Sequence, residues 1–156
     1  MKAQRTAVLV KPDGLNRGLI GEIVSRFERK GLKLVGIKMV NMTDDMLSDW
    51  YAEHKEKSFF NDLKSFMGSM PIVAMCWEGI DVVPVVRKLV GTTLGREAEA
   101  GSIRGDFGMS QQLNLIHASA NPTDAEREIK IVFEDDELFK YHGALDHVVY
   151  ADYELE

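Results

Sequence analysis

One histidine stands inside a short apolar stretch, residues 114–119 (NLIHAS). The stretch is typical of a β-strand, in which side chains alternate between two faces, so we expect His117 to share a face with Leu115 and Ser119 while Ile116 points the other way. An imidazole held on a rigid strand can act as a nucleophile or transfer a proton. The same pattern also fits a histidine partly buried beside the core with its nitrogens hydrogen-bonded, and the stretch alone favours that second interpretation.

Three cationic residues are expected at or near the ends of elements: Lys11 after a strand, Arg87 on a helix, and Arg104 before the His117 strand. The guanidinium group suits phosphate because its planar fork donates two parallel hydrogen bonds. Each of these side chains taken alone is more often a solvated surface charge. Three glycines follow Lys11, whereas a P-loop places its lysine after its glycines. A phosphate site built on these residues must therefore be of another kind.

The chain has 156 residues, 45% of them hydrophobic, which fits a single domain over residues 1–156. Its net charge of −6 and the lack of a Lys- or Arg-rich run argue against nucleic-acid binding. The single cysteine, Cys76, lies in an apolar stretch, where we expect a buried, unreactive thiol and a reducing compartment. Without an apolar run that resembles a signal peptide or a membrane span, we expect a cytoplasmic protein that does not enter a membrane.

Hydrophobic periodicity predicts the elements that must position these residues. Strands are expected at residues 6–10, 34–42 and 71–77 and around His117, and helices at 19–30, 43–51, 58–66, 82–90 and 122–133. The predicted N-caps are Thr43, Ser58, Asp81 and Asn121. Residues 11–14 are expected to form a turn, residues 91–101 a long loop, and residues 134–137 the start of a last short helix. This order favours a ferredoxin-like α/β sandwich with a four-stranded, mostly antiparallel sheet.

Taken together, the chain resembles the nucleoside diphosphate kinase family over nearly its whole length. The resemblance is carried by residues 10–14 (VKPDG), 17–22 (RGLIGE), 51 (Y), 54–55 (HK), 59–60 (FF), 87–88 (RK), 103–107 (IRGDF), 114–119 (NLIHAS) and 126–129 (EREI). Each stretch alone is a weak signal, but their order and spacing are very specific.

The resemblance implies that the γ-phosphoryl group of a nucleoside triphosphate passes to a nucleoside diphosphate through a phosphohistidine, in a ping-pong cycle. His117 is similar to the family's nucleophile, Glu128 to the carboxylate that orients its ring, and Ser119 to the serine that hydrogen-bonds that carboxylate. The implied contacts of the sugar and phosphates are Lys11, Tyr51, Arg87, Thr93, Arg104 and Asn114, with Asn114 at the ribose 3′-hydroxyl and Tyr51 placing Lys11. Mg²⁺ is expected on the nucleotide phosphates rather than in a protein cage. The family's assemblies favour a homohexamer over a tetramer.

Phe59, with Leu63 beside it, resembles the family's platform for the base. Stacking accepts any base because every base has a π face, so we expect broad base tolerance. The helical spacing of Phe59 fits core packing equally well. Two rival functions remain open: a regulatory protein of this fold that binds nucleotide without transferring phosphate, and an RNA-binding ferredoxin-like sheet, which the net charge of −6 argues against.

The sequence departs from the family pattern at four places. Residues 94–95 are Leu-Gly instead of Asn-Pro, residues 100–101 Ala-Gly instead of Pro-Gly, residues 111–113 Gln-Gln-Leu instead of Val-Gly-Arg, and residues 118–120 Ala-Ser-Ala instead of Gly-Ser-Asp. Loss of two prolines predicts a looser segment at 92–101. We expect these changes to affect affinity, rate and subunit contacts but not the reaction itself.

Overall fold

A four-stranded antiparallel sheet forms the centre of the computed structural model, which describes residues 3–143 and 146–155. Its strands are β1 (Gln4–Val10), β2 (Lys33–Val40), β3 (Ile72–Gly79) and β4 (Ile116–Ala118), and they lie in the order β2-β3-β1-β4. Every pair of neighbouring strands is antiparallel. This is the order of a ferredoxin-like double βαβ unit, so the predicted fold class is confirmed.

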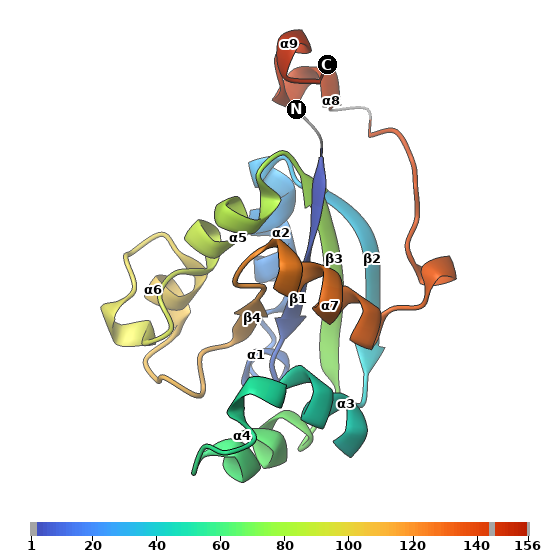
Figure 1. Ribbon diagram of the computed structural model, residues 1–156. Helices are drawn as coiled ribbons and strands as arrows, with labels where there is room; N and C mark the ends of the chain where they lie inside the picture. Colours follow the sequence, from blue (N-terminus) through green and yellow to red (C-terminus); the bar gives the residue numbers. More distant parts are fainter. Residues whose placement is uncertain (1–2, 144–145, 156) are drawn as a thin grey trace.

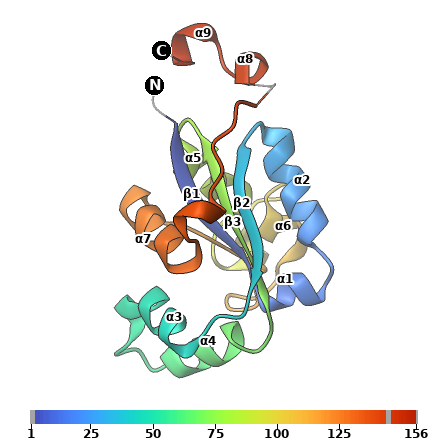
Figure 2. The same cartoon turned by 90° about the vertical axis from the view of Figure 1, so that its right-hand side faces the viewer.

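Helices cover both faces of the sheet (Figures 1 and 2). Helices α2 (Ile20–Lys30) and α5 (Val82–Val90) pack on one face, and α3 (Asp44–Trp50), α4 (Phe60–Met67) and α7 (Pro122–Val132) pack on the other. The shorter helices are α1 (Pro12–Asn16), α6 (Ile103–Phe107), α8 (Asp146–Val149) and α9 (Asp152–Leu155), with 3₁₀ turns at Ala52–His54, Gly95–Glu97 and Asp135–Glu137. None of the described helices is long and apolar enough to cross a membrane.

The sheet separates two hydrophobic cores. Along β1, Val8 and Val10 enter the core beneath α2 and α5, while Ala7 and Leu9 enter the core beneath α3 and α7. Because both faces are covered, the central strands β1 and β3 carry long apolar runs, Ala7–Val10 in β1 and Ile72–Trp77 in β3. Cys76 lies in the second core, which confirms the prediction that it is buried. Burial raises the pKa of its thiol to about 12, so we expect the thiol to be unreactive.

Two of the four predicted N-caps make the expected capping bond. The Thr43 side chain accepts from the Met46 amide at 3.2 Å, and Asn121 Oδ1 accepts from the Asp124 amide at 2.9 Å. The prediction for Ser58 is wrong, because the N-cap of α4 is Phe59, one residue later. Asp81 occupies the N-cap position of α5 as predicted, but its φ is 50° and its side chain makes no capping bond. A capping side chain reaches the first turn from an extended backbone, and the left-handed backbone of Asp81 does not provide it.

Three connecting segments differ from the prediction. Residues 11–14, expected to be a turn, begin helix α1, because the fixed φ of Pro12 suits the first helical position. The expected loop at 91–101 contains the 3₁₀ turn Gly95–Glu97. The acidic segment 134–137 forms a single 3₁₀ turn, in which Glu134 and Glu137 complete a capping box.

Candidate active site

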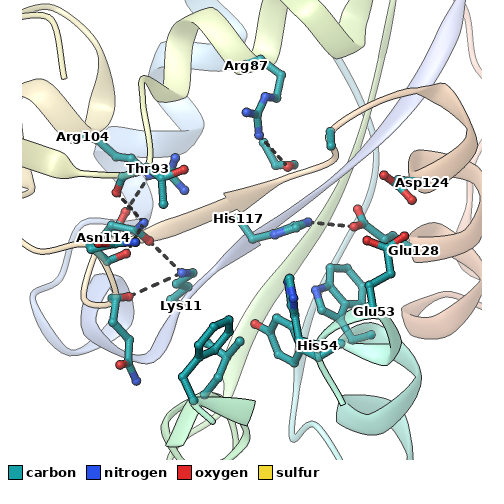
Figure 3. A pocket seen from close by; sticks show the side chains of 18 of the residues that line it. Lys11, Glu53, His54, Arg87, Thr93, Arg104, Asn114, His117, Asp124 and Glu128 are labelled. Carbon is teal, nitrogen blue, oxygen red and sulfur yellow. Dashed lines mark hydrogen bonds and ion pairs between the residues drawn. The ribbon is translucent and has the colours of Figure 1, made fainter. Parts of the chain in front are cut away.

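A cavity of about 670 Å³ opens beside β4, between α7, α5 and the α3–α4 segment (Figure 3). All nine side chains that were expected to bind or react line it, although they come from widely separated parts of the chain. They are Lys11, Tyr51, Phe59, Arg87, Thr93, Arg104, Asn114, His117 and Glu128, and Leu63 lies among them. The fold therefore brings the whole predicted set together.

His117 is held at one ring nitrogen by a buried carboxylate. Its Nε2 lies 3.1 Å from Glu128 Oε1, and Ser119 Oγ donates to the other carboxylate oxygen at 2.6 Å. Burial opposes ionisation of Glu128, but the hydrogen bonds and charge from His117, aided by Ser119, hold the pKa of this carboxyl below its ordinary value. Within the described residues, Nδ1 has no hydrogen-bond partner. The carboxylate thus fixes the ring and leaves its other nitrogen available.

The strand that carries His117 is shorter than predicted. His117 pairs with Leu9 of the central strand β1, and the edge of the Trp50 ring packs against the imidazole at 5.0 Å between ring centroids. Strand β4 begins only at Ile116 because Leu115 has a φ of 76°, which interrupts the alternation of faces. Leu115 therefore packs with Ile116 in the opposite core, and the predicted shared face of His117 and Leu115 is wrong.

Arg104 is buried and already hydrogen-bonded to three backbone carbonyls. Its Nε donates to Asn114 O at 3.2 Å, and its two terminal nitrogens donate to Gly91 O at 3.0 Å and Ile116 O at 2.6 Å. The arginine therefore ties the end of α5 to the segment that enters β4. A guanidinium has five N–H groups, so two remain for a ligand.

Lys11 and Arg87 complete a cluster of like charges. Burial and the Arg104 charge lower the pKa of Lys11 to about 8, whereas Asp13 opposes this change. Burial and the Arg87 charge lower the pKa of Arg104 to about 10. Among the residues that the structure describes, Arg87 makes a single long hydrogen bond, 3.5 Å to Ala118 O. Cations that repel one another in a partly dry site create a potential that attracts an anion.

Asn114 and Tyr51 support this cluster. Asn114 Oδ1 accepts from Lys11 Nζ at 2.7 Å, and its Nδ2 donates to Thr93 O at 2.9 Å and Gln111 O at 2.8 Å. Both amide hydrogens of Asn114 are therefore used inside the protein, and only the oxygen has capacity left. Burial, with a smaller effect of the Glu128 charge, raises the pKa of the Tyr51 hydroxyl, which keeps it a neutral donor.

The far end of the cavity is aromatic. Phe59 stands at the start of α4 with 47% of its surface exposed, so the interpretation of this residue as core is wrong. Its ring lies 5.6 Å from that of His54, centroid to centroid. An exposed ring beside a cavity is available for stacking on a planar ligand.

Several lining residues were not singled out as site residues from the sequence. They are Trp50, Glu53, His54, Gln111, Gln112, Asp124 and Arg127. Arg127 Nη2 lies 3.9 Å from Glu128 Oε1, while its other terminal nitrogen donates to Asp49 O at 3.0 Å. The EREI motif contains Arg127, but the motif alone does not show that this side chain reaches α3 and lies beside the Glu128 carboxylate.

The family model for nucleoside diphosphate kinase matches residues 4–138. A nucleoside diphosphate kinase of Parabacteroides distasonis is 54% identical over 88% of this chain and 90% of the relative, and one of Staphylothermus marinus is 50% identical over 90% and 100%. Among solved structures, a halophilic nucleoside diphosphate kinase of Halobacterium salinarum in complex with CDP has a TM-score of 0.93 at 46% identity, covering 96% of this chain and 99% of that chain. A family protein of Babesia bovis has a TM-score of 0.92 at 44% identity, covering 94% and 99%. The chain therefore belongs to the nucleoside diphosphate kinase family and is an enzyme with that activity.

Proposed function

We propose that His117 carries the phosphoryl group in a ping-pong cycle. The Nδ1 lone pair attacks the γ-phosphorus of a nucleoside triphosphate, the bond to the bridging oxygen breaks, and the nucleoside diphosphate leaves with the released electron pair. A second diphosphate then takes the phosphoryl group from the nitrogen by the reverse step. The observation that supports this proposal best is the His117–Glu128 hydrogen bond in a cavity that is also lined by the buried cations Lys11 and Arg104.

Glu128 acts in this proposal as the orienting group. A carboxylate on Nε2 keeps the proton on that nitrogen, so the lone pair stays on Nδ1, and it stabilises the positive ring that forms when the phosphoryl group is bound. The bond from Ser119 holds the carboxylate in place.

Lys11, Arg87 and Arg104 bind the phosphates. Phosphoryl transfer depends mainly on positioning and on neutralising charge that spreads over the equatorial oxygens. The proposed additional contacts are the hydroxyls of Tyr51 and Thr93 and the side-chain oxygen of Asn114, which faces the ribose 3′-hydroxyl. Because both amide hydrogens of Asn114 are used, its sugar contact is proposed through Oδ1.

Phe59 and Leu63 bind the base by stacking, which supports broad base tolerance. The Halobacterium salinarum relative was solved with CDP, a pyrimidine nucleotide, and we extend diphosphate binding to this chain on that basis.

Mg²⁺ enters in this proposal as part of the substrate. Within the described parts of the chain, no group of three or more His, Cys, Asp or Glu side chains is placed to hold a metal ion, and the phosphate end of the cavity is cationic. A protein cage does not fit these residues, whereas a magnesium–nucleotide complex does. The metal would reduce the charge of the phosphates before they meet the cations.

A homohexamer is proposed over a tetramer, on the family resemblance. Ile37 and Met39 on the edge strand β2 are 49% and 62% exposed, which supports assembly without deciding the number of subunits. Light scattering after size exclusion measures that number. A cytoplasmic location is proposed from the buried, unpaired Cys76.

The cycle is tested by trapping the intermediate. After incubation with γ-labelled ATP and Mg²⁺, we expect label that survives alkali, is lost in acid, and moves to any added nucleoside diphosphate. His117→Ala should not be labelled, whereas the surface variant His142→Ala should behave as the wild type. An unlabelled wild-type protein that still transfers phosphate would contradict the ping-pong proposal.

A further inference from the structure

A strained turn comes immediately before the His117 strand. Leu115 has a φ of 76°, and the Ile116 amide donates to Asn114 O at 2.9 Å, so Leu115 is the central residue of a γ-turn with positive φ. The Leu115 side chain is completely buried. A non-glycine residue keeps such a backbone only where its surroundings hold it there. Asn114 is the first residue of this turn and His117 follows it, and both line the cavity.

The segment 11–14 holds both backbone polar groups of Leu115. The Lys11 amide donates to Leu115 O at 2.9 Å, and Asp13 Oδ2 accepts from the Leu115 amide at 2.9 Å. Gly14 permits this approach, because a Cβ at that position would lie 2.7 Å from Leu115 O. The conformation of the turn therefore depends on the Asp13 side chain, which has no role in the phosphoryl transfer proposed above.

The second oxygen of the same carboxylate is buried without a hydrogen bond. Asp13 Oδ1 has no partner within the described residues, which is costly for a polar atom unless a charge compensates it. The compensating charges are Lys11 and Arg104, since Asp13 raises the pKa of both against the effects of burial and mutual repulsion. Asp13 is thus the acidic group that acts on the cations behind the cavity.

On the basis of the role assigned to His117 above, we propose that Asp13 is a positioning residue for phosphoryl transfer. One of its oxygens holds the strained turn that places Asn114 and His117, and the charge of the carboxylate favours the protonated form of Lys11 before a phosphate arrives.

This second role predicts a change in pH dependence. The charged and titratable groups that share the cavity with Lys11 are Tyr51, Glu53, His54, Arg87, Arg104, His117, Asp124, Arg127 and Glu128. Replacing Asp13 leaves all of these groups in place and removes one negative charge from the side of Lys11 that faces α1. The pKa of Lys11, which is about 8 in the folded protein, should then fall further.

The test compares Asp13→Asn and Asp13→Ala with Asp136→Asn, which removes an exposed carboxylate in a 3₁₀ turn. The measured quantity is the second-order rate constant for phosphorylation by magnesium–ATP as a function of pH, because it reports the ionisations of the free enzyme. Asp13→Asn keeps an oxygen for the Leu115 amide, so its rate below about pH 6 should stay close to that of the wild type while the basic limb moves roughly 1 pH unit lower. Asp13→Ala also releases the turn and should lose about 100-fold at every pH.

If both Asp13 variants showed the same dependence of the rate constant on pH as Asp136→Asn, the proposal would be overturned. So would an equal loss at every pH in Asp13→Asn without a shifted limb, since that is the behaviour of a purely structural residue. Because the amide has nearly the shape of the carboxylate, Asp13→Asn should fold even if the alanine variant does not. A wild-type enzyme that forms no phosphohistidine would instead refute the role of His117, which the same experiment detects separately.

Discussion

Glu128 binds His117 on the side of the ring that faces away from Lys11. Oε1 lies 3.1 Å from Nε2, and the imidazole stands between this carboxylate and Lys11 (Figure 3). The contact divides the two ring nitrogens between two tasks, one fixed by the protein and one left for the substrate. In the proposed cycle, a residue on α7 thereby orients the nucleophile on β4.

Replacing Glu128 should therefore slow phosphorylation of His117 while leaving nucleotide binding almost unchanged. Glu128→Gln keeps a hydrogen-bonding side chain but loses the negative charge, and we expect the rate of phosphohistidine formation to fall about 10- to 100-fold, the range seen when a partner of a functional histidine is removed. Rapid-quench kinetics with ATP measure this rate. Glu126→Gln, on the same helix but outside the cavity lining, is the matched control. Equal rates in the two variants would show that Glu128 does not orient the ring.

Phe59→Ala should weaken the binding of every nucleoside diphosphate by a similar factor. Loss of a stacked ring costs about 1–3 kcal/mol per base, and this loss does not depend on base-edge hydrogen bonds. Because Phe59 is 47% exposed, the free energy of unfolding should change little. Calorimetric titration with ADP, GDP, CDP and UDP measures the effect, and Phe139→Ala, at a 64% exposed position outside the cavity lining, provides the comparison. A loss confined to one base would reveal recognition of its edge instead of stacking.

Nucleotide affinity should decline as the pH rises through about 8, the pKa to which burial and Arg104 bring Lys11. The protonated lysine attracts phosphate and the neutral amine does not, so affinity is retained below this pKa and lost above it. Lys11→Arg keeps its charge across this range and should lose the dependence, even if its absolute affinity differs. ADP binding followed from about pH 6.5 to 9.5 tests the prediction. If the ADP affinity of Lys11→Arg declined over the same pH range, a group other than Lys11 would be responsible for the pH dependence.

Glu78 should contribute to stability only where it is ionised. Its two oxygens bind Arg5 Nε at 2.8 Å and Lys33 Nζ at 2.6 Å. Burial opposes its ionisation, but the bonds and charges of Lys33 and Arg5 outweigh burial and lower the pKa of this carboxyl. A pKa depressed by folding stabilises the protein above the unfolded-state value, and this contribution disappears as the pH falls through the folded-state value.

Glu78→Gln should therefore unfold more easily than the wild type at about pH 7, by at most about 1 kcal/mol because solvent screens pairs near the surface. The difference should vanish in strong acid, and activity should be unaffected because Glu78 does not line the cavity. Urea unfolding at several pH values measures it. A difference that persisted in acid would indicate lost packing instead of lost charge.

The four strands and the nine residues that meet in the cavity were predictable from the sequence. Apolar runs predicted all four strands, and the Asn121-Pro122 pair correctly predicted the start of α7, because capping depends on local chemistry. The nine predicted residues were recognisable through motifs whose order is specific to one family. Most of these motifs contain one or two of the nine residues, and the fold brings all nine to one cavity.

Backbone conformation and the use of hydrogen-bond donors were not predictable. Leu115 adopts a positive φ because Lys11 and Asp13 bind its backbone from a segment a hundred positions earlier. Arg104 is expected to contact phosphate, yet it also binds three carbonyls, which follows only from the folded arrangement of α6 beside the end of α5 and the segment that enters β4. Such long-range contacts leave no periodic or local signal in the sequence.

The central claim concerns which ring nitrogen of His117 receives the phosphoryl group. We propose determining it by ³¹P–¹⁵N correlated NMR of the phosphorylated enzyme with ¹⁵N-labelled histidine. Phosphorus coupled to Nδ1 of His117, with Nε2 still carrying its proton, is the expected result. Phosphorus on Nε2, or on a residue other than His117, would contradict the role given to the Glu128 contact.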